Sequence, residues 1–217
     1  MARVINNFIT IDEIHSIKEY FKNRSFELSG YLETGELHWE QSTIPEHILK
    51  EILHKKLIAT EGKNYKAASI TYRRVYQPYR PHVDSKFALS RDKSFTPTDD
   101  EGSAMIIPLD EGEYLNTVFW KENFATTEEM TQSIHNFINL PDAEVKNNNI
   151  TSKFELDFCS KEPEGDPNRC IYNHYELDIN FNWKLGTAVH WNRNQLHAAT
   201  DFTKHVMYKD AVSVVFN

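Results

Sequence analysis

From residue 69 to the C-terminus, the chain is a series of short segments with the composition and alternation of β-strands. β-Branched and aromatic residues fill these segments, and such side chains suit the pleated surface of a sheet. A hairpin is also predicted over residues 31–39, where the chain turns at Thr34 and Gly35. The strands expected after it cover residues 69–76, 104–109, 115–120, 154–158, 175–181, 186–191 and 209–216.

Three helix starts carry a hydroxyl residue followed three positions later by glutamate. This is the capping box, in which the two side chains satisfy backbone N–H groups that the first helical turn leaves without partners. The starts are Thr10 with Glu13, Thr43 with Glu46, and Thr126 with Glu129. Apolar residues then follow at helical spacing, which predicts amphipathic helices with one face in a core.

Helices in the first quarter and strands afterwards favour a mainly β (α+β) fold, a β-sandwich or jelly roll with helices packed outside. At 217 residues, 40% of them apolar, the chain is long enough for one well-packed domain. We expect this domain to span residues 1–217, with a helical and hairpin part at 1–68 and a core at 69–217. Residues 121–180 read as an insert, and the loop-like stretches 85–103 and 140–170 as lids.

Composition disfavours several classes of function. The net charge of −8 argues against a protein that coats nucleic acid, because phosphate binding rests on clustered lysine and arginine. No apolar run is long enough to cross a bilayer, and the first residues lack the apolar core of a signal peptide. Cys159 and Cys170 form no disulfide framework, and their role is not readable. We therefore expect a cytoplasmic protein, whose oligomeric state the sequence does not indicate.

The sharpest chemical motif is His82-Val83-Asp84. Side chains two positions apart on an extended strand share a face, so an imidazole and a carboxylate lie side by side there as adjacent metal ligands. Far along the chain, Gly186 leads through an apolar strand and a polar turn to His197. If His197 returns across the sheets, the three residues make the facial triad of two histidines and one carboxylate that non-haem Fe(II) oxygenases use.

A third motif lies in the last strand, where Lys209, Ala211 and Ser213 share one face. A lysine at the start of a core strand is suited to pair with a carboxylate of a ligand.

Taken in this order, the motifs resemble those of the Fe(II)/2-oxoglutarate-dependent oxygenases, within them the prolyl-hydroxylase-like branch. The resemblance covers about residues 69–216. It rests on Tyr76 and Tyr79 ahead of His82 and Asp84, on Gly186 through His197, and on Lys209, Ala211 and Ser213.

The resemblance implies a double-stranded β-helix, a cupin-like jelly roll whose mouth holds Fe(II). His82, Asp84 and His197 would bind the metal and carry catalysis, while Lys209, Ser213 and Tyr76 would bind the co-substrate 2-oxoglutarate. O₂ would then oxidise a C–H bond of an amino-acid, peptidyl or small-molecule substrate, with release of succinate and CO₂. The turn after Tyr76 is shorter than in the family and lacks its glycine, so Tyr72 stays an alternative, as Lys204 does for Lys209.

Other interpretations stay open at this point. The same strands suit a non-catalytic, cupin-like protein that binds a metal or small molecule, in which Lys209 has no buried anionic partner. A metal-dependent isomerase or epimerase of this architecture is disfavoured, because such sites usually carry more histidines. Arg80 and Arg193 are candidates for contact with the substrate, and His190 reads as a core or pocket-wall histidine.

Overall fold

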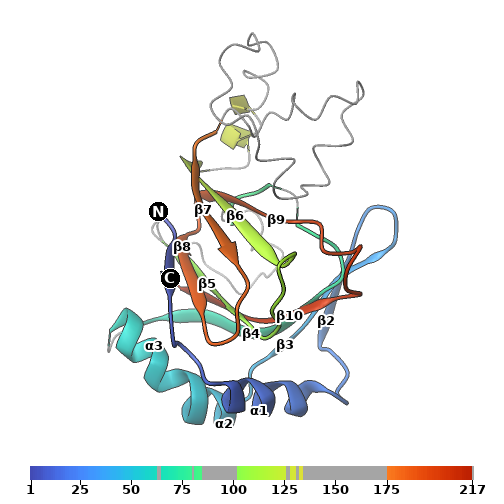
Figure 1. Ribbon diagram of the computed structural model, residues 1–217, viewed down its shortest axis with the longest axis vertical. Helices are drawn as coiled ribbons and strands as arrows, with labels where there is room; N and C mark the ends of the chain where they lie inside the picture. Colours follow the sequence, from blue (N-terminus) through green and yellow to red (C-terminus); the bar gives the residue numbers. More distant parts are fainter. Residues whose placement is uncertain are drawn as a thin grey trace.

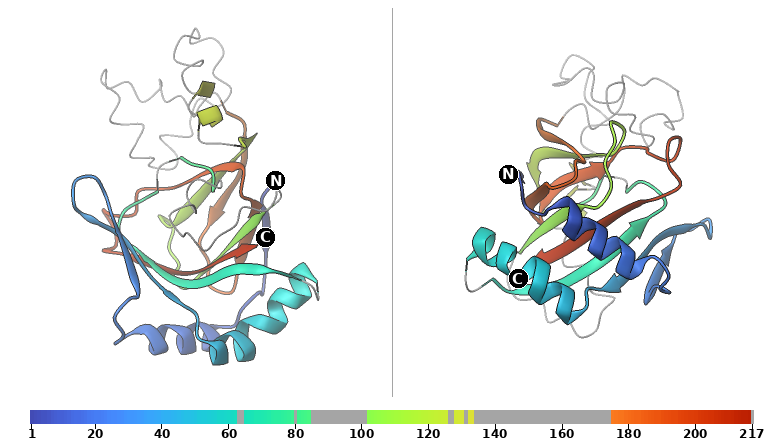
Figure 2. Two further views of the ribbon diagram at one scale, coloured as in Figure 1. Left: turned by 180° about the vertical axis from the view of Figure 1, so that it is seen from behind. Right: turned by 60° about the horizontal axis from the view of Figure 1, so that its bottom comes forward.

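The computed structural model describes residues 1–62, 65–79, 81–84, 102–125, 128–130, 132–133 and 175–216. Its strands form two sheets that face each other, and helices cover the outer face of the larger one (Figures 1 and 2). The larger sheet has seven strands in the order β1-β8-β5-β10-β4-β3-β2, and the smaller has three in the order β7-β6-β9. This is the expected jelly roll with external helices, open rather than closed into a barrel.

The strands of the larger sheet pair antiparallel throughout. In chain order they are β1 Arg3–Ile5, β2 Leu28–Tyr31, β3 Leu37–Thr43, β4 Ala67–Val75, β5 Ser103–Pro108, β8 Ala188–Asn192 and β10 Lys209–Phe216. The strands β2 and β3 form the predicted hairpin, whose turn holds Gly35 at a φ of 84°. Such a positive φ suits glycine, which has no Cβ to clash.

The smaller sheet contains β6 Asn116–Asn123, β7 Leu177–Asn182 and β9 Gln195–Ala199. Residues 79 and 81–84 extend it along the edge of β9. There His82 and His197 exchange two backbone hydrogen bonds of 3.0 Å, and the amide of Asp84 donates to the carbonyl of Arg193 at 2.8 Å. The sequence did not predict β9 as a strand, yet this strand carries His197 into the sheet.

The helices are α1 Ile11–Phe21, α2 Glu46–Ile48 and α3 His54–Glu61, with a π-helical turn at Leu49–Leu53 between the last two. The capping box of Thr10 and Glu13 forms as predicted. The one expected at Thr43 was wrong: Thr43 pairs with Thr71 in the β3–β4 ladder, and Pro45 is the cap residue instead. The N–H and the hydroxyl of Thr43 both donate to the carboxylate of Glu27 at 3.0 Å, so neither is available to a helix, and the helix begins later.

Of the third expected helix, residues 128–130 and 132–133 are helical. The predicted strand at 154–158, both cysteines and most of the two loop-like stretches lie outside the described residues. No helix in the described part of the chain is long and apolar enough to cross a membrane.

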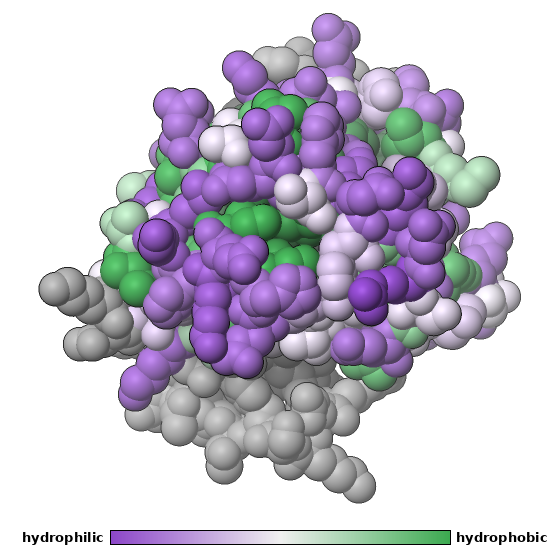
Figure 3. Space-filling model, turned by 90° about the horizontal axis from the view of Figure 1, so that it is seen from below, coloured by the Kyte–Doolittle hydropathy of each residue, from purple (hydrophilic) through white to green (hydrophobic). Residues whose placement is uncertain are grey.

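An apolar core packs against each of the two faces of the larger sheet. One lies between this sheet and the helices and includes Ile17, Leu53 and Val212. The other lies between the sheets and includes Phe119, Trp191 and Ala211. Seen from below, the face that carries the helices is mostly hydrophilic, with apolar atoms at the bottom of a hollow (Figure 3).

Alternation along β10 divides its residues between the two cores. Asp210, Val212 and Val214 face the helices, whereas Lys209, Ala211 and Ser213 face the space between the sheets. The space between the sheets is therefore where the predicted site residues of this strand belong.

Candidate metal centre

His82, Asp84 and His197 come together at the edge of the smaller sheet. Each offers one ligand atom, and these atoms lie within 4.8 Å of one another. Nε2 of His82 is 3.7 Å from one carboxylate oxygen of Asp84, and Nε2 of His197 is 3.5 Å from the other. The cross-strand pair of His82 and His197 explains the convergence, because side chains directly opposite each other on antiparallel strands lie close together.

His197 is held in one orientation from the protein side. Its ring is buried between Phe119 and Trp191, with centroid distances of 5.6 and 5.1 Å. Nδ1 lies 2.9 Å from the backbone carbonyl of Gln195, so Nδ1–H donates and Nε2 keeps its lone pair. A hydrogen bond of this kind on the second ring nitrogen is what usually orients a metal-binding histidine.

Asp84 is held as a carboxylate. Burial alone would raise the pKa of this group, but the nearby imidazoles of His197 and His82 and the guanidinium groups of Arg73 and Arg193 lower it. The side chains of Asp84 and His82 remain 32% exposed, so the group of three opens to one side. An ionised carboxylate and two imidazoles fit a divalent transition metal.

Arg193 fixes the backbone of the metal-binding segment. Its Nε donates to the carbonyl oxygen of Asp84 at 2.9 Å, while its own carbonyl accepts from the Asp84 amide. Arg193 is buried and stands against Gly102, where a Cβ would lie 2.9 Å from the Arg193 side chain. This residue was a candidate for substrate contact, and in the structure its guanidinium is engaged in holding Asp84; Arg80, the other candidate, lies outside the described residues.

Lys209 lies between the sheets, only 2% exposed. Its Nζ is 4.0 Å from the ring centroid of Trp183 and 4.7 Å from that of Phe202. Burial lowers its pKa to about 7, against the attraction of Asp110, which is itself paired with Lys18. Lys204, the weaker alternative from sequence, is exposed.

Ser213 shares the inner face of β10 with Lys209, opposite Thr71 and Ile106. The two tyrosines considered for the co-substrate lie elsewhere. The hydroxyl of Tyr76 donates to Glu40 at 2.6 Å, and burial together with this carboxylate raises the Tyr76 pKa to about 12. Its ring packs against Tyr208 rather than against the metal-ligand group.

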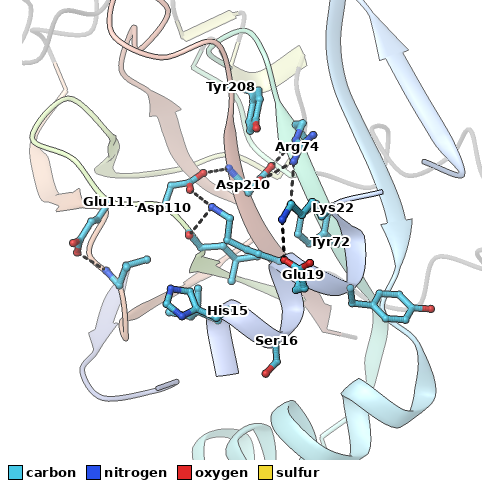
Figure 4. Close-up of a pocket in the computed structure, with 15 residues that line it drawn as sticks. His15, Ser16, Glu19, Lys22, Tyr72, Arg74, Asp110, Glu111, Tyr208 and Asp210 are labelled. Atoms are coloured by element: carbon cyan, nitrogen blue, oxygen red, sulfur yellow. Dashed lines mark hydrogen bonds and ion pairs between the residues drawn. The ribbon is translucent and has the colours of Figure 1, made fainter. Parts of the chain in front are cut away.

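Tyr72 faces the helices. Its ring stacks on Phe21 with centroids 4.3 Å apart, in the core outside the larger sheet. Together with Arg74, Tyr208 and Asp210 it lines a cavity of about 1060 Å³ beside α1 (Figure 4). The structure therefore does not bring Tyr72 to the three ligands.

The tyrosine beside the metal-ligand group is Tyr79, to which the sequence assigned no role. Its ring centroid is 5.5 Å from His82 and 4.4 Å from His38, and burial raises its pKa. Strict alternation puts residues 79 and 82 on opposite faces, so periodicity gives no signal for this contact. Bends at Tyr76, Gln77 and Pro81 interrupt the alternation.

The chain matches no protein-family model. A search of curated proteins gives no match either.

Solved structures with the same fold do match. One is the non-haem α-ketoglutarate-dependent epimerase SnoN from nogalamycin biosynthesis, at 11% identity and a TM-score of 0.59 over 99% of this chain and 77% of that one. Another is HygX from Streptomyces hygroscopicus with nickel and 2-oxoglutarate bound, at 12% identity and a TM-score of 0.58 over 100% and 82%.

A third is the α-ketoglutarate-dependent carbocyclase SnoK, at 12% identity and a TM-score of 0.56 over 99% and 78%. SnoN and SnoK are described as non-haem enzymes that depend on α-ketoglutarate, and HygX holds nickel and 2-oxoglutarate. The chain described here therefore has the jelly-roll fold of the 2-oxoglutarate-dependent oxygenases.

Proposed function

We propose that the protein is an Fe(II)- and 2-oxoglutarate-dependent oxygenase. The observation that carries this proposal is the convergence of His82, Asp84 and His197 to within 4.8 Å in a jelly roll. We assign the three residues as the metal ligands. Two imidazoles and one carboxylate are the donor set of non-haem Fe(II) oxygenases, which leaves coordination positions for a keto acid and O₂.

The bound iron supplies the oxidising chemistry, and the protein contributes binding, orientation and exclusion of water. Gln195 orients His197 through its carbonyl, and Arg193 holds the backbone of Asp84. Phe119, Trp191 and Tyr79 surround the histidines with apolar rings. These contacts prepare the ligands before a metal arrives.

Lys209 is the residue we assign to the distal carboxylate of 2-oxoglutarate. Its ammonium is buried against aromatic rings, and no carboxylate in the described part of the chain lies within ion-pair distance of it. A buried cation is expensive without an anion, and a ligand carboxylate supplies one through a charge-assisted hydrogen bond. Ser213, on the same face of β10, is a second donor toward this ligand.

The same lysine favours an oxygenase over a non-catalytic, cupin-like binding protein. A protein that only held a metal would gain nothing from an unpaired ammonium between its sheets. Among enzymes of this fold, SnoN and SnoK are described as an epimerase and a carbocyclase. For this chain we propose hydroxylation of a C–H bond of an amino-acid, peptidyl or small-molecule substrate, with 2-oxoglutarate oxidised to succinate and CO₂.

The test begins with binding. Metal-free protein is titrated anaerobically with Fe(II) or Mn(II), and thermal stabilisation by N-oxalylglycine, an analogue of 2-oxoglutarate, is then measured. We expect binding of one metal ion per chain, lost in His197→Ala and Asp84→Ala and kept in His15→Ala, a substitution of an exposed histidine on α1. Stabilisation by N-oxalylglycine is expected to disappear in Lys209→Ala and to persist in Lys204→Ala.

Turnover is then followed as succinate release from 2-oxoglutarate after exposure of the Fe(II)-loaded protein to air. Mass spectrometry of a stimulating substrate distinguishes the reaction types. Gain of one oxygen atom supports hydroxylation, whereas an unchanged mass indicates epimerisation and a loss of two hydrogen atoms indicates ring closure or desaturation. A wild-type protein that binds neither metal nor N-oxalylglycine would refute the whole assignment.

A further inference from the structure

Besides Lys209, a second cationic side chain, that of Arg73, lies on the face of β4 that points into the space between the sheets. In the strand register Arg73 is opposite Gln41 of β3 and Ala211 of β10. Ala211 belongs to the core between the sheets, and so does Val75, which is two residues after Arg73 on β4. Since alternate residues share a face, the Arg73 side chain projects to the same side.

The contacts of the Arg73 guanidinium leave donor capacity unused. Nη2 donates to the side-chain oxygen of Gln41 at 3.0 Å, and Cζ lies 5.6 Å from the ring centroid of Trp39. Nε is buried and has no acceptor among the described residues. A guanidinium carries five N–H donors, so one amide oxygen does not satisfy it.

Arg73 is close to both parts of the site assigned above. Burial lowers the pKa of His38 and the charge of Arg73 lowers it further; after the imidazoles of His197 and His82, the same charge also lowers the pKa of Asp84, so Arg73 lies within electrostatic reach of the metal-ligand group. Lys209 is opposite Val75 in the register, which makes it the diagonal cross-strand neighbour of Arg73. Such neighbours lie about 7–8 Å apart, within the span of a small ligand.

The charges in this region do not balance when co-substrate and metal are bound. Fe(II) and the dicarboxylate 2-oxoglutarate cancel each other. The carboxylate of Asp84 then faces two guanidinium groups, those of Arg73 and Arg193. Arg193 donates to the backbone carbonyl of Asp84 and Arg73 donates to the side-chain amide oxygen of Gln41, and neither of these neutral acceptors cancels a positive charge. An excess of buried positive charge favours an anionic partner.

We propose that Arg73 binds a carboxylate of the prime substrate, which makes the substrate a small molecule with a free acid group. This assignment rests on the proposed function. Lys209 is the deeper of the two cations and takes the co-substrate. Arg73 is only partly buried, as suits a group that meets the molecule entering after 2-oxoglutarate. A carboxylate also matches the planar fork of a guanidinium better than a neutral group does.

The experiment measures binding before turnover. Protein loaded with Mn(II) and N-oxalylglycine is titrated with free L-amino acids and short aliphatic carboxylic acids, each beside its carboxamide. We expect at least one acid to bind about 10- to 100-fold more tightly than its amide, the range for a hydrogen bond between charged groups. The preference is expected to vanish in Arg73→Gln and to be kept in part by Arg73→Lys, which retains the charge but not the fork.

Arg24→Gln is the matched control, because Arg24 is an exposed arginine just after α1 whose Nε donates to the carbonyl of Tyr20. It is expected to leave the acid preference unchanged. In turnover with Fe(II), Arg73→Gln is expected to raise the KM for the acid substrate far more than the KM for 2-oxoglutarate. Circular dichroism of each variant confirms that it is folded.

Two results would overturn the assignment while leaving the proposed function standing. One is equal binding of acids and amides, or no acid binding at all, in a protein that binds Mn(II) and N-oxalylglycine. The other is an equal rise in both KM values in Arg73→Gln, which would make Arg73 part of the 2-oxoglutarate site. Failure of the wild type to bind N-oxalylglycine is a different result and refutes the proposed function itself.

Discussion

Replacing Lys209 by methionine is expected to stabilise the ligand-free protein and to abolish binding of 2-oxoglutarate. Lysine and methionine are similar in length, so the substitution removes the charge with little change in packing. Lys209 is 2% exposed and its pKa is lowered to about 7 by burial. The difference from the ordinary value of 10.5 corresponds to about 5 kcal/mol, the free-energy cost of keeping the ammonium in this environment.

The aromatic rings offset part of that cost. The contacts of Nζ with Trp183 and Phe202 contribute about 1–2 kcal/mol each when desolvated, and methionine regains part of this through sulfur–aromatic contacts. We therefore expect a net gain of about 2 kcal/mol at pH 7. For a chain of this size the gain raises Tm by about 4–8 °C.

The pH dependence gives a second, independent readout. Because the Lys209 pKa is lower in the folded than in the unfolded protein, the unfolded chain binds more protons between pH 7 and 10.5. The lysine therefore lowers the free energy of unfolding of the wild type most at neutral pH. This penalty becomes smaller as the pH rises from 7 to 10.5. The advantage of Lys209→Met is expected to shrink steadily toward pH 10.

Urea denaturation of metal-free protein at pH 7 and pH 10 measures both effects, with Lys204→Met as the control for an exposed lysine. The same samples are titrated with N-oxalylglycine after loading with Mn(II). The reasoning is refuted if Lys209→Met is less stable than the wild type at pH 7, or if its stability relative to the wild type does not change with pH.

Three further outcomes are expected. Arg193→Met loses the hydrogen bond to the Asp84 carbonyl and is expected to weaken metal affinity about 10-fold, measured by anaerobic titration with Mn(II); unchanged affinity would contradict a positioning role. Gly102→Ala puts a Cβ 2.9 Å from the Arg193 side chain and 3.0 Å from the carbonyl oxygen of Phe216, so unfolding free energy is expected to fall by about 1–3 kcal/mol in urea melts. His190 has its pKa lowered to about 4 by burial and by Arg3, so its contribution to stability falls as pH drops from 6.5 to 4. His190→Gln is expected to reduce this acid sensitivity by up to about 3 kcal/mol, and equal losses in both proteins between pH 7 and 4.5 would count against it.

The sequence predicted the jelly roll because its strands have the period of two and the β-branched composition that sheets select. Lys209 was placed on the inner face of the last strand for the same reason, and the structure has it there. The meeting of His197 with the His82–Asp84 pair was a prediction from a motif order, since no local pattern encodes contacts between distant segments. The antiparallel bridge that brings the two histidines together joins distant segments, so local sequence patterns do not predict it.

The contacts that the sequence did not predict depend on features that local patterns do not encode: pairing between distant segments and bends in the chain. Thr43 has the signature of a helix cap, but its backbone joins a strand ladder with Thr71. The β9 strand follows two asparagines and an arginine that read as an irregular turn, although this turn carries the chain from β8 in the larger sheet to β9 in the smaller one. Tyr79 reaches His82 because the chain bends between them, and a bend is not visible in periodicity.

The bridge between His82 and His197 ties the spacing of the two imidazoles to main-chain hydrogen bonds. Register in such a pair is all-or-none: a shift by one residue turns every side chain to the opposite face. Inserting or deleting a single residue between Tyr79 and His82 would therefore carry one imidazole away from the other while leaving the strands able to pair. The number of residues in this short segment therefore matters more for the site than the identity of most of them. Variant libraries of the site should contain substitutions in the segment but no insertions or deletions.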